Sequence, residues 1–306
     1  TNARVPFGDL ANKTQASMQE IRRSIQRLGT LGYPFNLKSD SVERLPTHMI
    51  HARELEASLH CRRIGRRIEW KLHVASTQDE LKKIRQKAQD GTVLLAETQG
   101  SGRGRLGRRW FSPLGGIWMS LLLKPTWSKS HQILPLAFGA ALTKAIRDTT
   151  GISTCLKWPN DVTVQSRKVA GILSEAIYEG DKLSSLIVGV GVNANVRTTM
   201  LPKELAGTTT SLSQELSIDV DRNLLTLRIL EEMDNTYRVF EAGKGIELLN
   251  DVRQVCSTIG KKVEITTSEG SFKGEAQDIG GAGELIVRLR NGETAQFYAG
   301  DVIHLH

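Results

Sequence analysis

The sequence predicts an α+β fold with a mixed sheet, preceded by a helix–turn–helix segment and followed by a small antiparallel β-barrel. Three observations support this prediction: helical periodicity near the start, strands interrupted by single helices in the middle, and apolar–polar alternation near the end. A chain of 306 residues is too long for one typical core, which favours two or three domains. We expect the domains to span 1–62, 63–258 and 259–306.

The composition indicates an ordinary globular protein of the cytoplasm. Hydrophobic residues make up 39% of the chain and charged residues 24%. No apolar run approaches about 18 residues, and the start lacks the apolar core of a signal peptide, so we expect no membrane association. The three cysteines are far apart and form no C-x-x-C pair, which argues against disulfides or zinc. The net charge of +8 favours nucleic acid, nucleotides or acidic proteins as partners.

Residues 8–32 predict two short helices with a turn near Ala16 and Ser17. In the second helix, Ile21, Ile25 and Leu28 repeat with the spacing of one buried stripe. The candidates for contacts with DNA phosphates and base edges lie off that stripe: Arg22, Arg23, Gln26 and Arg27. Residues 33–46 would form a two-stranded wing. An ordinary helical hairpin with a charged, solvated face remains an open alternative.

The middle of the chain alternates strands and helices. A connecting helix is expected over 47–65, and its basic run at 62–67 is read as solvated surface. Strands are expected at 67–74, 92–98, 116–125, 153–157, 161–165, 168–178 and 184–191. Helices are expected at 78–89, 133–151, 208–216, 222–241 and 246–255. Residues 261–305 then alternate apolar and polar side chains, with turns at 269–270, 280–281 and 291–292, which predicts the barrel.

The stretch "ETQGSGRGRLGRRWFSPLGG" at 97–116 has three glycines spaced as in a dinucleotide-binding turn. Such a turn also needs a following helix and an acidic residue about 20 positions later. Here Ser-Pro and Gly-Gly turns lead into a strand, and no acidic residue lies between Glu97 and Lys144. A Walker loop is excluded as well, because no G-K-[ST] follows. The stretch therefore does not predict a nicotinamide site.

This loop instead carries four arginines within seven residues, 103–109, which we name the arginine–glycine loop. Its like charges repel, and guanidinium groups bind carboxylate and phosphate oxygens, so we expect the loop to close over anions. Closure over a carboxylate and a triphosphate would suit acyl-adenylate formation. A disordered basic loop or an RNA-binding tract remains an alternative. Other polar groups are expected at strand ends, where ligand sites gather: Lys157, Asn160, Asp161, Lys168 and Asn193.

The run "GRGRLGRRWFSP", followed in order by "KWPND", "RKVAGIL" and "GVGVN", resembles the biotin protein ligases, most strongly over 70–197. With the flanking segments, the chain resembles the bifunctional ligase/repressor class. The resemblance implies a class II synthetase-like core with a mixed sheet, an N-terminal winged helix–turn–helix and a C-terminal SH3-like barrel. The helix that precedes the helix–turn–helix in that class is not found here. The winged domain is therefore expected to be incomplete, and whether DNA binding survives is left open.

The resemblance also implies roles for individual residues. Gln78 replaces the usual asparagine of a Ser-Thr-Asn motif. The implied biotin-binding residues are Ser76, Thr77, Gln78, Gln99, Gly102, Arg103, Gly104, Arg105, Lys168 and Gly171. The implied ATP-binding residues are Arg105, Arg108, Trp110, Asn160, Asn193 and Arg197. The implied catalytic residues are Arg103, Arg105, Lys168 and Asp161, and Asp161 would also bind Mg²⁺.

The activity implied by the resemblance uses biotin as substrate with ATP and Mg²⁺. Biotin and ATP would form biotinyl-5′-AMP, and a lysine of a carboxylase carrier domain would then accept the biotin. Operator DNA and a second copy of the chain are further expected partners. Two alternatives stay open: a lipoate–protein ligase, and a DNA-binding regulator that only senses biotin. The arginine–glycine loop and "KWPND" favour biotin over lipoate.

Overall fold

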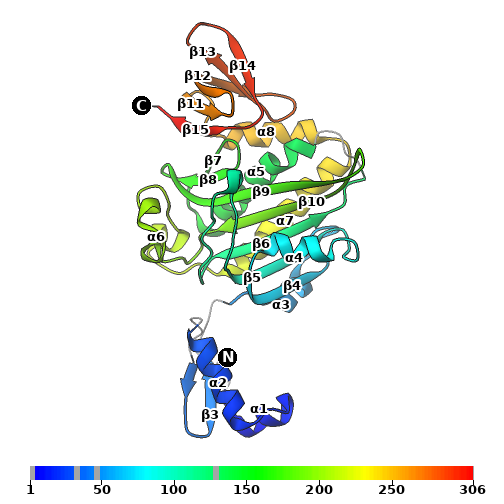
Figure 1. The fold of residues 1–306 in the computed structure, drawn as a ribbon, viewed down its shortest axis with the longest axis vertical. Coiled ribbons are helices and arrows are strands. Elements are labelled where there is room, and N and C mark those ends of the chain that lie inside the picture. The colour runs from blue at the N-terminus through cyan, green and yellow to red at the C-terminus, as the bar shows by residue number, and fades with distance from the viewer. Residues whose placement is uncertain (1–3, 31–34, 45–48, 127–130, 306) are drawn as a thin grey trace. The chain divides into compact units, whose positions relative to one another are not determined.

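The structure is a computed structural model that describes residues 4–30, 35–44, 49–126 and 131–305 (Figure 1). It divides into two compact units, Thr1–Met49 and Ile50–His306. Among the described helices, none combines the length and the apolar composition needed to cross a membrane.

The first unit contains the predicted helix–turn–helix and the predicted hairpin. Its helices are α1 (Phe7–Thr14) and α2 (Met18–Thr30), and its strands are β1 (Arg4–Pro6), β2 (Phe35–Leu37) and β3 (Ser41–Arg44). The strands form an antiparallel sheet in the order β1-β3-β2. A capping box starts α2, because Ser17 N donates to Glu20 Oε2 at 2.9 Å and Glu20 N donates back to Ser17 Oγ at 3.3 Å. Strand β1 was not expected, since three residues ending in proline carry no alternation.

The core of the first unit confirms most of the predicted stripe. Ile21 and Ile25 are buried together with Phe7 and Val42, whereas Leu28 is half-buried. Arg22 was expected to face outward, but its side chain packs within the first unit. Its guanidinium carbon lies 4.4 Å from the centroid of the Phe7 ring, and the group donates to Ser39 O at 2.6 Å.

The second unit is built on a seven-stranded mixed sheet in the order β4-β5-β6-β10-β9-β8-β7. These strands are β4 (Ile68–Val74), β5 (Thr92–Gln99), β6 (Ile117–Leu123), β7 (Cys155–Lys157), β8 (Asp161–Val164), β9 (Arg167–Glu179) and β10 (Lys182–Val192). Only β4 and β5 pair in parallel among them, and α4 (Thr77–Ile84) connects the two. The remaining pairs are antiparallel, which confirms the predicted α+β class with hairpins.

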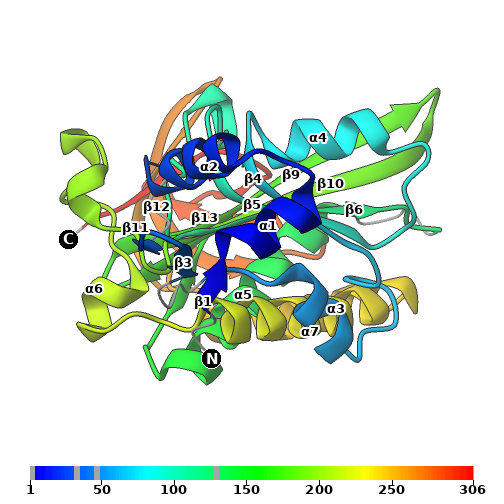
Figure 2. The ribbon, with the colours of Figure 1, turned by 90° about the horizontal axis from the view of Figure 1, so that it is seen from below.

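Helices cover both faces of this sheet (Figure 2). The long helices α5 (Leu134–Thr150), α7 (Arg222–Glu241) and α8 (Gly245–Val255) pack over the main core, and α4 packs over the other face. Strand β5 shows the two faces directly: Val93 and Leu95 belong to the main core, and Leu94 belongs to the cluster under α4. Shorter elements are α3 (Ala52–Ser58), α6 (Leu212–Leu216), and the 3-10 turns η1 (Arg105–Gly107), η2 (His131–Ile133), η3 (Thr198–Met200) and η4 (Lys203–Leu205).

Three expected helices are shorter than predicted. The connecting helix is only α3, because the Asp234 carboxylate accepts hydrogen bonds from the backbone N–H groups of 62–64 and holds them out of a helix. The helix expected at 208–216 begins at Leu212, because residues 208–210 exchange backbone hydrogen bonds with Lys168. Helix α4 ends at Ile84 rather than at 89.

The end of the chain is a five-stranded antiparallel sheet that belongs to the second unit. Its strands are β11 (Lys262–Thr267), β12 (Gly270–Ile279), β13 (Leu285–Leu289), β14 (Thr294–Phe297) and β15 (Asp301–His304), in the order β14-β13-β12-β11-β15. The indole Nε1 of Trp158 donates to Gly283 O at 3.0 Å, and Arg253 Nε donates to Asp278 Oδ1 at 2.8 Å. These contacts attach the sheet to the core beside the turn between β7 and β8.

Candidate active site

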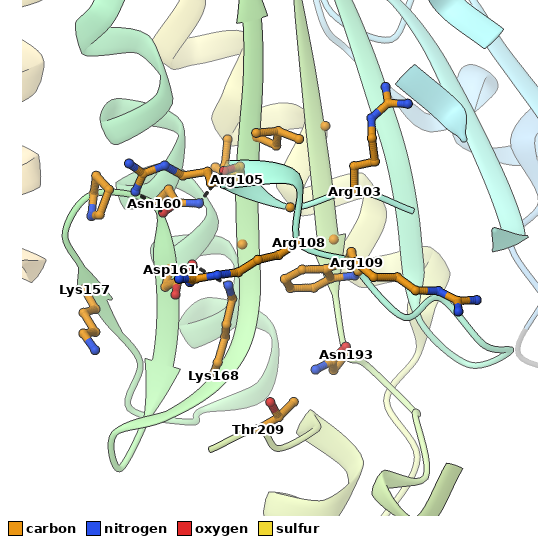
Figure 3. Close-up of a pocket in the computed structure, with 18 of the residues that line it drawn as sticks. Arg103, Arg105, Arg108, Arg109, Lys157, Asn160, Asp161, Lys168, Asn193 and Thr209 are labelled. Atoms are coloured by element: carbon orange, nitrogen blue, oxygen red, sulfur yellow. Dashed lines mark hydrogen bonds and ion pairs between the residues drawn. The ribbon is translucent and has the colours of Figure 1, made fainter. Parts of the chain in front are cut away.

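A cavity of about 630 Å³ opens in the second unit where several strands end (Figure 3). Its walls come from the end of β5, the arginine–glycine loop, the turn between β7 and β8, and the start of β9. The end of β10, residues 201–209 and strand β15 complete it. A cavity of this size fits the range typical of small-molecule sites.

The arginine–glycine loop forms a hairpin-like ridge over this cavity. Gly104 N donates to Arg108 O at 2.8 Å, and Trp110 N donates to Gly102 O at 2.9 Å. A β-carbon on Gly102 would lie 2.5 Å from Trp110 O, so only glycine fits there. The tip is the short turn η1, in which Leu106 has a φ of 54° and Gly107 a φ of 72°. The loop thus has its own backbone hydrogen bonds, which the arginine content alone did not predict.

The four arginines of the loop divide into two pairs. Arg105 and Arg108 extend toward Asn160 and Asp161, whereas Arg103 and Arg109 extend away from them (Figure 3). Arg105 Nη1 lies 3.3 Å from both Asn160 Oδ1 and Gly300 O, and burial lowers the pKa of its guanidinium. Arg108 pairs with Asp301, Arg103 pairs with Asp79, and the guanidinium of Arg109 lies over the Phe111 ring.

Lys168 lines the cavity beside Asp161 and Trp110. Its Nζ is 2.6 Å from Asp161 Oδ1 and 4.9 Å from the centroid of the Trp110 ring. The nearby Lys157 has a lowered pKa, chiefly because burial disfavours its charged form. Asn160 holds the turn in place by donating its Nδ2 to Ile172 O at 2.8 Å. The Lys168 ammonium and the Asp161 carboxylate therefore meet near the indole of Trp110, and Asn160 and Lys157 also line the cavity.

Two glycines allow the Trp110 ring to lie against the sheet. A β-carbon on Gly191 would be 2.7 Å from Trp110 Nε1, and one on Gly171 would be 3.2 Å from the same ring. Either side chain would displace the indole. Strands β9 and β10 therefore provide a flat floor on which an aromatic ring can lie.

The opposite end of the cavity is small and polar. The backbone N and the Oγ1 of Thr77 both donate to Gln99 Oε1, at 2.9 and 3.0 Å. Gln99 Nε2 in turn donates to Ser112 Oγ at 2.9 Å. Gln78 Nε2 donates to Glu175 Oε2 at 2.8 Å, so this glutamine is held by an acidic partner. The end wall thus offers amide and hydroxyl groups whose orientation is fixed.

The structure brings most of the predicted site residues together on the cavity wall. These are Thr77, Gln78, Gln99, Arg103, Gly104, Arg105, Arg108, Trp110, Asn160, Asp161, Lys168, Gly171 and Asn193. Ser76, Gly102 and Arg197 are not on that wall. Ser76 is buried and caps α4 by accepting from Asp79 N at 3.4 Å, and Arg197 is exposed. The role expected of each residue stays a prediction.

Some residues of the site were not predicted as site residues. Asp79 and Glu175 flank Arg103, Thr209 pairs with the start of β9, and Asp301 comes from the terminal sheet. Asp79 has the sequence pattern of an ordinary acidic residue in the first turn of a helix. Asp301 lies 193 positions from Arg108, and no local pattern connects them. Only the tertiary structure reveals these contacts.

The candidates for DNA contacts lie in the first unit. Arg23, Gln26 and Arg27 are exposed on α2, and Arg22 is half-buried against Phe7. The side chain of Arg22 is therefore less available than those of the other three.

Comparisons with known proteins agree with this fold. The profile of the Biotin/lipoate A/B protein ligase family matches residues 70–193, and that of the Biotin protein ligase C terminal domain matches residues 258–305. The Bifunctional ligase/repressor BirA of Bacillus spizizenii is 33% identical over 255 residues, which cover 81% of this chain and 77% of that protein. The protein of the same name from Escherichia coli is 28% identical, and the match covers 61% of its length.

A solved structure and a further relative extend the comparison. The Biotin--[acetyl-CoA-carboxylase] ligase of Mycobacterium tuberculosis is 32% identical, over 71% of this chain and 80% of that protein. The structure of biotin protein ligase from Aquifex aeolicus in complex with biotin and ATP superposes with a TM-score of 0.69. It is 31% identical and covers 78% of this chain and 98% of that one. With both family profiles, these matches show that the chain belongs to the biotin protein ligase family.

Proposed function

We propose that this protein is an ATP-dependent biotin–protein ligase. It forms biotinyl-5′-AMP and transfers the biotin to a lysine of a carboxylase carrier domain. The observation that carries this proposal is one cavity that joins a small polar end at Thr77 and Gln99 to a cationic centre at Lys168 and Arg105. The neutral ring of biotin suits the polar end, and its carboxylate suits the cations.

The first step joins the two substrates. A carboxylate oxygen of biotin attacks the α-phosphorus of ATP, a new P–O bond forms, and the bond to the pyrophosphate leaving group breaks. Negative charge grows around this phosphorus in the transition state, and fixed cations stabilise it. Lys168 and Arg105 supply those cations, and the 2.6 Å contact with Asp161 orients the Lys168 ammonium. Trp110 would cover the adenine, with Arg108, Asn193 and Arg197 near the phosphates.

The residues present fit a Mg²⁺ ion that arrives with the nucleotide. Magnesium is usually held by one or two carboxylates together with substrate phosphates. The described part of the chain has no group of three His, Cys, Asp or Glu side chains that would form a complete protein cage. Asp161 supplies one carboxylate beside the neutral amide of Asn160. A bound Mg²⁺ would neutralise phosphate charge.

The second step transfers biotin to the carrier. The neutral amine of the carrier lysine attacks the carbonyl carbon of the mixed anhydride, an amide bond forms, and AMP leaves with the C–O bond electrons. The attacking nitrogen must lose a proton, and Asp161 is our candidate to accept it. The enzyme itself needs no nucleophile. The arginine–glycine loop shields the anhydride from water until the carrier binds.

The test is a transfer assay with biotin, ATP, Mg²⁺ and a carboxylase carrier domain. We expect the carrier mass to increase by one biotin. The assay is repeated with lipoate and a lipoyl carrier domain. Transfer of lipoate in place of biotin would overturn the proposal in favour of a lipoate ligase, and transfer of neither would favour a ligand-sensing regulator.

We also propose a second function, repression of transcription. It is supported by α2, which exposes Arg23, Gln26 and Arg27 beside the β2–β3 hairpin, and by the repressor names of two relatives. Helix–turn–helix proteins commonly bind two half-sites as dimers, so we extend the proposal to a homodimer on operator DNA. A gel shift with the upstream DNA of the biotin genes tests it. Binding should weaken steeply with salt, and no shift in the presence of biotin and ATP would leave a ligase alone.

A further inference from the structure

The guanidinium of Arg22, on α2, contacts the turn between β2 and β3. Its Nη2 donates to the backbone carbonyl oxygen of Ser39 at 2.6 Å. The turn is closed by Lys38 N, which donates to Ser41 O at 2.9 Å. Arg22 therefore joins the helix that is expected to enter a DNA groove to the hairpin that is expected to flank it.

The same guanidinium lies over an aromatic ring of the core. Its central carbon is 4.4 Å from the centroid of the Phe7 ring, which is within the range of a cation–π contact. Phe7 is completely buried and packs with Ile21, Ile25 and Val42. Because the core fixes the ring, the ring fixes the plane of the guanidinium, and the hydrogen bond to Ser39 then fixes the turn.

Two contacts from the start of the chain hold the other side of the turn. Phe7 N donates to Asp40 O at 2.9 Å, and Arg4 Nε donates to Ser41 Oγ at 2.7 Å. Arg4 also pairs with Asp40, but these side chains are 50% and 72% exposed, so water screens the ion pair. Strands β2 and β3 have only three and four residues, and so short a hairpin is marginally stable by itself. The turn therefore depends on anchors outside the hairpin, and Arg22 is its anchor on α2.

The neighbouring Arg23 differs from Arg22 in both respects. Its side chain is exposed, and within the described residues it has no hydrogen bond or ion pair. Arg22 is half-buried and already has two partners. A side chain that neutralises a phosphate must be able to face the DNA, which suits Arg23 better than Arg22.

We propose that Arg22 is a positioning residue that holds the β2–β3 turn against α2, and that contacts with DNA phosphates are made by exposed neighbours such as Arg23. The proposal rests on the proposed repressor function only in its consequence for DNA. A helix and a hairpin held at a fixed spacing lose less conformational freedom when both contact one duplex, which favours affinity.

The first test needs no DNA. Hydrogen–deuterium exchange is measured by mass spectrometry on peptides covering 35–44 of the full chain. Arg22→Gln should raise the exchange rate of the turn amides by about fivefold, because it removes an aromatic contact and a charged donor, both partly exposed to solvent. Arg23→Gln is the matched control and should leave this exchange unchanged. Peptides from α1 should change little in either variant.

The second test measures binding to the upstream DNA of the biotin genes at several salt concentrations, with biotin and ATP present. Each phosphate contact contributes about 0.9 to the slope of log K against log salt. Arg22→Gln should weaken binding by about fivefold and leave this slope unchanged, whereas Arg23→Gln should reduce the slope by about one.

Arg22→Lys separates the two roles further. Lysine keeps the charge that a phosphate contact needs, but it lacks the planar group that stacks on Phe7 while donating to Ser39. We therefore expect Arg22→Lys to increase turn exchange and to bind DNA as weakly as Arg22→Gln. This variant replaces Arg22→Gln if the latter does not fold.

Three outcomes would overturn the inference. The first is turn exchange in Arg22→Gln equal to that of the unmodified protein. The second is an equal increase in the peptides from α1, which would indicate general loosening of the first unit. The third is a salt slope reduced as much by Arg22→Gln as by Arg23→Gln, which would make Arg22 a phosphate contact. If the unmodified protein binds no DNA, increased turn exchange in Arg22→Gln leaves the positioning role standing and overturns the proposed repression alone.

Discussion

Replacement of Lys168 by glutamine should impair adenylate formation severely. Two opposite unit charges at about 4 Å interact with about 4 kcal/mol at the effective dielectric of a protein surface. The Lys168 side chain is 31% exposed. Solvent screening at that exposure reduces the usable stabilisation of the transition state to about 2 kcal/mol.

The same substitution has a second cost. It leaves the Asp161 carboxylate without the ammonium that lies 2.6 Å away, and that negative charge then faces the substrate carboxylate and phosphates. We assign a further cost of about 2 kcal/mol to this repulsion, by the same reasoning. The sum of about 4 kcal/mol corresponds to a loss of about 10³-fold in kcat/KM.

Biotin-dependent exchange of pyrophosphate into ATP measures this loss without involving the carrier. Lys83→Gln is the matched control, because Lys83 is 68% exposed on α4 and pairs with Glu80 outside the cavity. Lys168→Arg keeps the charge and should lose less activity than Lys168→Gln. A Lys168→Gln variant within about threefold of the unmodified protein would refute the electrostatic role given to this residue.

Glu97→Gln should lower the free energy of unfolding in urea by about 3 kcal/mol, because a neutral amide replaces the carboxylate that lies 2.8 Å from the buried Arg222. A loss below about 1 kcal/mol would contradict this. Gly191→Ala should raise the KM for ATP by about tenfold and leave the KM for biotin unchanged. The reason is that the new β-carbon would lie 2.7 Å from Trp110 Nε1 and displace the indole. An equal increase in both KM values would contradict the placing of ATP against Trp110. Burial lowers the pKa of Lys157 from 10.5, so the unfolded chain binds more protons in the window just below that value and folding stability rises with pH there. The unfolding free energy of the unmodified protein should therefore gain on that of Lys157→Met as the pH rises toward 10.5, and a constant difference would contradict the shift.

The regular elements were predictable where burial dictates the sequence pattern. Strand β5 is apolar on both faces because helices cover both, and its observed span, Thr92–Gln99, is close to the predicted 92–98. Helix α7 was predicted at 222–241 and spans Arg222–Glu241, because Asp221 caps its start and its apolar residues repeat with helical spacing. Such signals are local and therefore visible in the sequence.

The helices whose bounds differ from the prediction are limited by contacts with residues far along the chain. Residues 62–64 are kept out of a helix by Asp234, and residues 208–210 by Lys168. In the site, too, local motifs were predictable and contacts between distant residues were not. The arginines and "KWPND" were visible as a motif, but the contacts of Arg103 with Asp79 and of Arg108 with Asp301 join single charged residues that no spacing rule connects.

The most direct test of the central claim is a single-turnover experiment without carrier. The protein is mixed with biotin, Mg²⁺ and ATP labelled on the α-phosphate, and the bound products are separated after rapid quenching. We predict that label accumulates on the protein as biotinyl-5′-AMP in an amount close to one per active site. Addition of the carrier domain should then release the label as AMP while the carrier gains biotin. Formation of labelled AMP only when the carrier is present, with no adenylate before it, would contradict the two-step account.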